Sequence, residues 1–141
     1  MYRLLLVVVV GCTYYPDSYR DFRGSFSGTR ETVGCIDIAI DKGSDALAEG
    51  PVLSYGFGNR CRHPATIDLA TLHVRGRTED GVDHDLIAFD PQHELRPEPL
   101  DAMFAGRENI EYVSAQPIVQ VCVDIGGIDG SQPHDERWVC K

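Results

Sequence analysis

The sequence has no apolar run long enough to cross a bilayer, no two cysteines close together and no excess of positive charge. Its longest apolar run, residues 4–10, falls far short of the roughly 20 residues that a transmembrane helix needs, so we expect no permanent helical anchor. Its 13 Lys and Arg residues stand against 22 Asp and Glu residues, a net charge of −9 at pH 7. An acidic surface of this kind repels nucleic acid, so we expect no nucleic-acid partner.

The sequence also lacks the motifs of common enzymes. It contains no Gly-x-Ser-x-Gly elbow, no His-Glu-x-x-His helix and no phosphate-binding glycine loop. The pairs His84-Asp85 and His134-Asp135 are neighbours in sequence, and neighbours in a strand point to opposite faces. The stretch from Asp124 to Asp129 lacks the dense oxygen ligands of a calcium loop and is predicted to be a plain turn. We therefore predict no catalytic residue, no metal ligand and no cofactor.

The N-terminus carries the strongest signal. Arg3 precedes the apolar run, which ends in Val9-Val10-Gly11-Cys12. This order resembles a bacterial lipoprotein signal peptide with its lipobox. The resemblance implies that residues 1–11 are removed, that Cys12 carries the lipid, and that the protein lies in the cell envelope. Thr13 follows the cysteine, which in Gram-negative lipoproteins favours the outer membrane. The alternative is that the four valines form a buried β-strand.

With Cys12 assigned to lipid, four cysteines remain, namely Cys35, Cys61, Cys122 and Cys140. An even number in an exported chain predicts two disulfides, with three pairings open. A zinc site is the alternative, but zinc ligands usually come as close Cys-x-x-Cys pairs. The preferred pairing joins Cys61 to Cys122 across the sheets and Cys35 to Cys140 at the ends of the domain.

The pattern along the chain divides it into three parts. Residues 1–11 form the signal peptide, residues 12–32 the lipid anchor and a flexible tether, and residues 33–141 a single β domain. From Val33 onward, apolar residues alternate with polar ones, which is typical of half-buried strands. Prolines exclude a long helix between residues 90 and 112, although residues 100–104 could form one helical turn. A phase slip near Ala70-Thr71 indicates a bulge or a crossing between sheets.

These strands predict an all-β fold, an antiparallel β-sandwich of about seven strands with two disulfides. The predicted inward positions are Ile36, Ile38, Leu53, Tyr55, Phe57, Ile67, Leu69, Val119, Val121 and Val123. The strand spacing over residues 33–125, with a proline-containing segment and a glycine before Ile110-x-Tyr112, resembles immunoglobulin-like domains. The Cys–Trp–Cys arrangement of antibody domains is absent, because Trp138 follows Cys122.

Two classes of function fit these patterns. The first is a lipid-anchored, non-catalytic binding or structural module, whose partners are the membrane and an envelope protein or glycan. An exposed apolar patch rimmed by polar groups would favour it. The alternative is a small envelope hydrolase or metal-binding enzyme whose site leaves no trace in the sequence. A pocket gathering His73, His84 and nearby carboxylates would favour that alternative.

Overall fold

The computed structural model describes residues 17–18 and 30–141, and nearly all regular structure within them is β-strand. Cys12, residues 1–11 and most of the predicted tether lie outside the described residues. No helix in the described part of the chain is long and apolar enough to cross a membrane. The strands are β1 (Asp17–Ser18), β2 (Arg30–Val33), β3 (Ile36–Lys42), β4 (Val52–Asn59), β5 (Ala65–Ile67), β6 (His73–Arg77), β7 (Asp83–Ala88), β8 (Glu98–Leu100), β9 (Phe104–Val113), β10 (Gln120–Asp124) and β11 (Trp138–Cys140).

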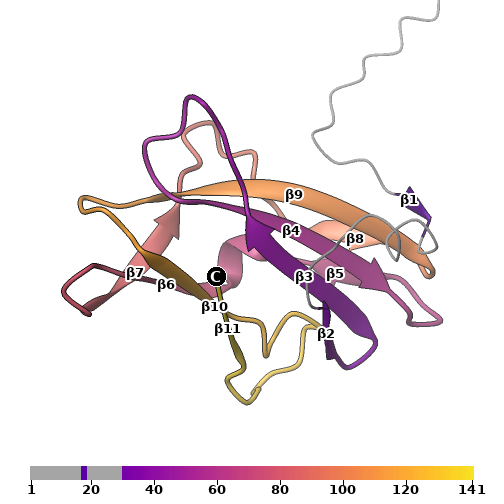
Figure 1. Ribbon diagram of the computed structural model, residues 1–141. Helices are drawn as coiled ribbons and strands as arrows, with labels where there is room; N and C mark the ends of the chain where they lie inside the picture. The colour runs from indigo at the N-terminus through magenta and orange to yellow at the C-terminus, as the bar shows by residue number, and fades with distance from the viewer. Residues whose placement is uncertain (1–16, 19–29) are drawn as a thin grey trace, which may run out of the picture.

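The strands form an antiparallel β-sandwich, as predicted. The main strand order is β11-β10-β6-β7-β9-β4-β3-β2, and β5 pairs separately with β8. Strands β7 and β9 pair only at Ile87↔Val113 and Ala88↔Tyr112, and this short seam joins two layers. One layer holds β2, β3, β4 and the long strand β9, and the other holds β6, β7, β10 and β11 (Figure 1).

The core lies between these layers and follows the period of two that the sequence predicts. Nine of the ten predicted inward residues are buried, and they pack in one cluster with residues of β6, β7 and β9. The exception is Val119, which lies just before β10 and is 53% exposed, so its assignment to the core is wrong. The cluster also contains Ile40, Cys61, Val74, Leu86, Leu100, Ile110, Tyr112, Ile125 and Ile128.

The structure also shows what forms in the two regions where the sequence pattern is irregular, near Ala70-Thr71 and over residues 100–104. A 3-10 turn, η1 (Leu69–Thr71), separates β5 from β6, and the chain passes there from the small sheet to the main one. No helical turn forms over residues 100–104, because β8 ends at Leu100 and β9 begins at Phe104. Pro99 is accommodated because β8 pairs on one side only, with β5. The sheet begins at Arg30, within the range predicted as tether, and Asp17–Ser18 pairs with β9.

Two disulfides join the four predicted cysteines, but the preferred pairing is wrong. The bonds are Cys35–Cys61 and Cys122–Cys140. The β3–β4 register places Ile36 opposite Asn59, so Cys35 and Cys61 meet at one end of that hairpin. Cys122 and Cys140 lie directly opposite each other on β10 and β11, with Cα atoms 4.0 Å apart. Strand pairing within each layer therefore decides the connectivity, and neither bond crosses between the layers.

Candidate binding site

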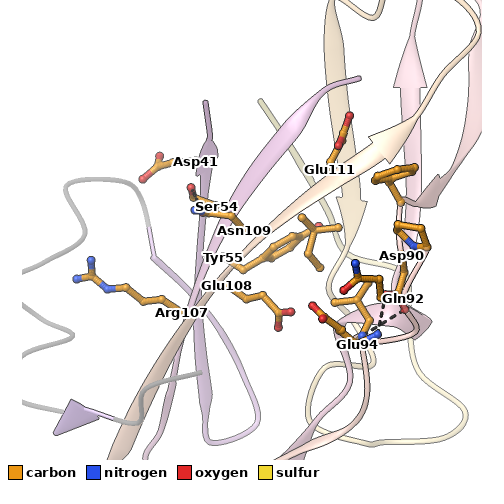
Figure 2. Close-up of a pocket in the computed structure, with 14 residues that line it drawn as sticks. Asp41, Ser54, Tyr55, Asp90, Gln92, Glu94, Arg107, Glu108, Asn109 and Glu111 are labelled. Atoms are coloured by element: carbon orange, nitrogen blue, oxygen red, sulfur yellow. Dashed lines mark hydrogen bonds between the residues drawn. The ribbon is translucent and has the colours of Figure 1, made fainter. Parts of the chain in front are cut away.

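An open cleft of about 750 Å³ lies beside the middle of β9, and we call it the β9 cleft. Strands β4 and β9 form one wall, and residues 89–95, which follow β7, form the other. Figure 2 shows Glu108 and Glu94 directed into the same space from the two walls. The charged residues that line the cleft are Asp41, Asp90, Glu94, Arg107, Glu108 and Glu111. Five carboxylates and one guanidinium line the cleft, but on β9 only Glu108 has the inward parity, and Arg107 and Glu111 have the opposite one.

Two of these carboxylates hold the cleft in shape. Asp90 accepts hydrogen bonds from the backbone N–H groups of Glu94, at 2.8 Å, and Leu95, at 3.2 Å, which fixes the loop that forms one wall. Glu111 accepts from the N–H groups of Glu49, at 2.8 Å, and Gly50, at 3.1 Å, which ties the β3–β4 connection to β9. Because their carboxylate oxygens accept these hydrogen bonds, Asp90 and Glu111 hold the walls of the cleft in position.

Glu108 is the carboxylate with the most unusual environment. It shares the inward direction of Ile110 and Tyr112 on β9, a direction that the rest of the strand fills with apolar side chains. Partial burial, together with the negative charges of Glu98 and Asp90, raises the pKa of the Glu108 carboxyl. A carboxylate held in this way is stabilised by any cation that enters the cleft.

One lining residue of the cleft, Tyr55, is buried and pairs with a second buried tyrosine, Tyr112. The hydroxyl oxygens of Tyr55 and Tyr112 lie 2.5 Å apart, so each phenol has a partner although both are removed from water. Burial raises the pKa of Tyr55 well above its usual value, and burial also raises the pKa of Tyr112 to about 12. Both hydroxyls are therefore neutral at physiological pH and serve as structural partners.

An apolar strip borders the cleft at the seam between the layers, and we call it the seam patch. It consists of Ile87, Phe89 and Val113, which are 75%, 53% and 55% exposed. Ile87 and Val113 are direct partners in the β7–β9 ladder, and Phe89 also lines the β9 cleft. Exposed apolar side chains grouped beside a polar cleft are typical of interaction surfaces.

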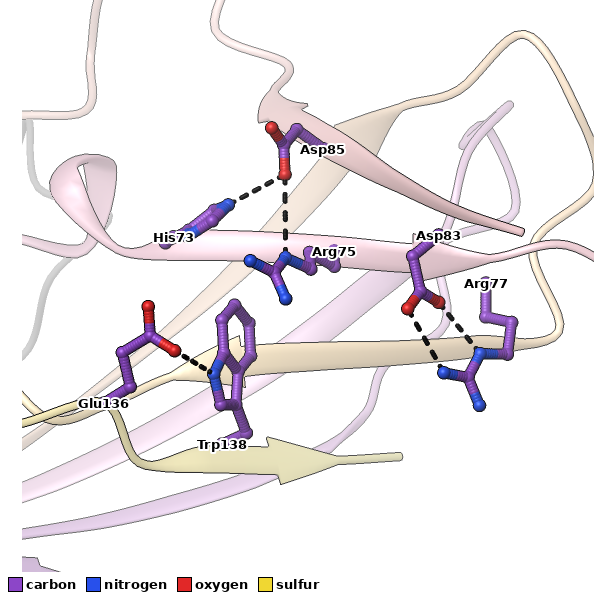
Figure 3. A network of polar contacts seen from close by, with 7 residues as sticks. All are labelled: His73, Arg75, Arg77, Asp83, Asp85, Glu136 and Trp138. Atoms are coloured by element: carbon purple, nitrogen blue, oxygen red, sulfur yellow. Dashed lines mark hydrogen bonds and ion pairs between the residues drawn. The ribbon is translucent and has the colours of Figure 1, made fainter. Parts of the chain in front are cut away.

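The histidines do not gather at this site. His73 and Asp85 form a cross-strand hydrogen-bonded pair, 2.7 Å from Nε2 to the carboxylate, on the outer face of β6 and β7 (Figure 3). Arg75 lies 3.8 Å from the same carboxylate and stacks over Trp138. His84 is exposed and has the opposite parity to Asp85 on β7, so His73 and His84 belong to opposite faces of the sheet. The structure thus pairs His73 with a carboxylate from the neighbouring strand rather than joining the sequence neighbours His84 and Asp85.

The stretch from Asp124 to Asp129 is a turn, as predicted. The Asp124 carboxylate is 6% exposed and accepts from the backbone N–H groups of Gly126, at 2.9 Å, and Arg137, at 2.8 Å. His134 Nε2 lies 3.3 Å from its other oxygen, so His134 pairs with Asp124 rather than with Asp135. Burial opposes ionisation of Asp124, but these hydrogen bonds prevail and lower its pKa. A Cβ at Gly126 would lie 2.0 Å from the Asp135 carbonyl oxygen, which explains the glycine there.

The described residues contain no group of three or more His, Cys, Asp or Glu side chains arranged to hold a metal ion. The β9 cleft itself was not predicted. In the sequence only Glu108 indicates the cleft, because it shares the inward-facing alternation of Ile110 and Tyr112. The opposite wall comes from residues 89–95, which have no periodic pattern, and their approach to β9 depends on tertiary packing.

Comparison with known proteins leaves the family open. No protein-family model matches the chain, and no curated protein matches it. Among solved structures, the chain is similar to MPT63, a secreted protein from Mycobacterium tuberculosis. The two are 13% identical over 73% of this chain and 88% of MPT63, with a TM-score of 0.39. The β-sandwich fold stated above therefore rests on the strand pairing of this chain itself.

Proposed function

We propose that this chain is a lipid-anchored protein of the bacterial cell envelope whose β domain is a non-catalytic binding module. The proposed location follows from the lipobox at Cys12 together with the two disulfides, which persist in oxidising compartments. Labelled palmitate fed to expressing cells should appear in the wild-type protein and be absent from a Cys12→Ser variant. Equal labelling of both proteins would contradict lipidation at Cys12.

The binding role is supported by one arrangement, the β9 cleft with the seam patch at its border. The cleft offers carboxylates, and the patch offers apolar side chains within the same surface. A ligand that uses both must carry positive charge and apolar groups, which describes a basic amphipathic segment of an envelope protein. The acidic character of the whole chain adds long-range attraction for such a partner.

A titration with a defined probe tests this binding role. The probe is a peptide of alternating lysine and valine, and the control peptide has glutamate in place of lysine. We expect saturable binding of the lysine peptide, weakened by added salt and by the double variant Glu94→Gln/Glu108→Gln. The matched control, Glu79→Gln/Asp135→Asn, removes the same charge at exposed sites elsewhere and should bind as the wild type does. Equal binding of both peptides, or equal loss in both double variants, would reject the cleft as the site.

A further inference from the structure

The lipid anchor proposed above has a limited reach, because β1 ties the chain to the sandwich only five residues after Cys12. Asp17 and Ser18 pair with Ala105 and Phe104 at the start of β9. An extended chain of five residues spans at most about 18 Å, so Cys12 cannot lie farther than that from Asp17. The opposite end of β9, at Val113, lies eight residues beyond Ala105, or about 27 Å along the strand. One end of the sandwich is therefore held close to the membrane.

The surface at that end consists of two loops that are locked together. Asn59 is fully buried, and its amide nitrogen donates to the carbonyl oxygens of His63, at 3.0 Å, and Leu100, at 2.9 Å. Its backbone carbonyl accepts from the N–H of Met103 at 2.8 Å. These bonds join the loop after β4 to the turn before β9, so the two present one rigid surface. Figure 1 shows the end of β4, the start of β9 and β1 at the same end of the molecule.

This surface, which we call the Phe104 end, has the composition of a membrane-interface contact. Its exposed residues include Arg62, His63, Met103 and Phe104, together with Arg60, Pro64 and one acidic residue, Asp101. Met103 and Phe104 are 55% and 41% exposed, respectively, although both are large and apolar. Apolar and aromatic side chains partition into the headgroup region, and arginine pairs with lipid phosphate. The two cleft carboxylates that β9 carries, Glu108 and Glu111, lie farther along the strand.

We propose that the Phe104 end rests on the membrane that holds the acyl chains of Cys12, which directs the β9 cleft and the seam patch away from the bilayer. This orientation rests on the proposed lipid anchor. The short covalent connection brings this end to the bilayer, and the exposed Met103 and Phe104 side chains favour contact over a free tether. The occupant of the Phe104 end is the lipid interface itself.

Tryptophan quenching by brominated lipids tests the orientation on the lipidated full-length protein in vesicles of brominated phosphatidylcholine with phosphatidylglycerol. In a Trp138→Phe background, single tryptophans are introduced by Phe104→Trp, by His63→Trp and, as the matched control, by Ile87→Trp at the seam patch. We expect a loss of fluorescence with a blue shift for the first two and unchanged fluorescence for the third. His63 is exposed in its loop, so the second variant keeps the test valid if Phe104→Trp perturbs folding.

The outcomes separate the two proposals. Mass spectrometry of the purified protein first establishes whether Cys12 carries lipid, and a chain without lipid overturns the proposed location and this orientation together. A lipidated chain in which neither Phe104→Trp nor His63→Trp is quenched overturns the orientation alone. Quenching of Ile87→Trp to the same extent also overturns it, because the seam patch would then contact lipid.

Discussion

The two ends of β9 differ in charge, in packing and in what they can contact. At its start, β9 meets β1 and a surface that exposes Arg62, Met103 and Phe104. At its middle, the same strand borders the β9 cleft, and at its far end it borders the seam patch. A single strand therefore connects the end nearest the proposed lipid anchor to the end that carries the proposed binding surface. A small sandwich can keep these surfaces apart because one long, regular strand spans both.

The largest effect is expected from a substitution in the core, because both ends of β9 depend on the same folded sandwich. Val121 is 5% exposed on β10, and Val121→Asp places an unpaired carboxylate in the core shared by the layers. We expect a loss of at least about 4 kcal/mol, enough to unfold many domains of this size. Val119→Asp is the matched control, because Val119 is 53% exposed two residues away. Circular dichroism during urea titration measures both, and equal destabilisation would contradict the assigned core.

The next prediction concerns the two disulfides, which should contribute similar stability but restrain different parts of the chain. Cys35–Cys61 closes a separation of 26 residues beside the Phe104 end, and Cys122–Cys140 closes 18 residues between β10 and β11. Chain entropy gives about 3 kcal/mol for each bond, so either double Cys→Ser variant should lose a similar amount. Hydrogen exchange should differ, with faster exchange around Asn59 and Met103 only when Cys35–Cys61 is removed. Non-reducing peptide mapping provides the check on connectivity, and a Cys61–Cys122 peptide would contradict the structure.

A smaller effect is expected for Asp124, whose buried carboxylate accepts hydrogen bonds from two backbone N–H groups. Its lowered pKa means that its stabilisation is present above its ordinary pKa of 3.8 and is lost as pH falls through the lower folded value. We expect Asp124→Asn to destabilise the domain at pH 7 by about 1–2 kcal/mol, since two backbone N–H groups lose a charged acceptor. Urea denaturation at pH 7 and near pH 3 should show the difference shrinking in acid. A difference that stays constant across this range would contradict the assigned ionisation.

The smallest effect has the opposite sign and belongs to Glu108 in the cleft. Its pKa is raised above the ordinary 4.5, so its contribution to stability is present below 4.5 and is lost as pH rises through the folded pKa. Glu108→Gln should therefore be slightly more stable than the wild type at pH 7 and equal to it near pH 4. Glu94→Gln, on the exposed wall, serves as the control. A Glu108→Gln variant that is less stable at pH 7 would show that the charge supports folding.

The same contrast explains how far the sequence could be interpreted. The strands and the core followed from alternation, because burial on one face of a strand leaves a period of two in residues such as Ile36 and Ile38. The disulfide pairing could not be predicted in this way, since it depends on β11 lying beside β10. The three residues of β11 show no pattern that indicates which strand lies next to them. Nothing in the alternation marks Asn59, although it is buried and its side-chain amide joins two loops. The cleft depends on an irregular loop meeting β9, and only the inward Glu108 marks it.

The most direct test of this account is a two-dimensional NMR titration of the disulfide-bonded domain with the lysine–valine peptide. The account predicts that amide signals shift at Ile87, at residues 89–95 and at residues 107–111, while those of Arg62, His63 and Met103 stay in place. Shifts centred on the Phe104 end, or shifts spread evenly over the acidic surface, would contradict the division of β9 into a membrane end and a binding end.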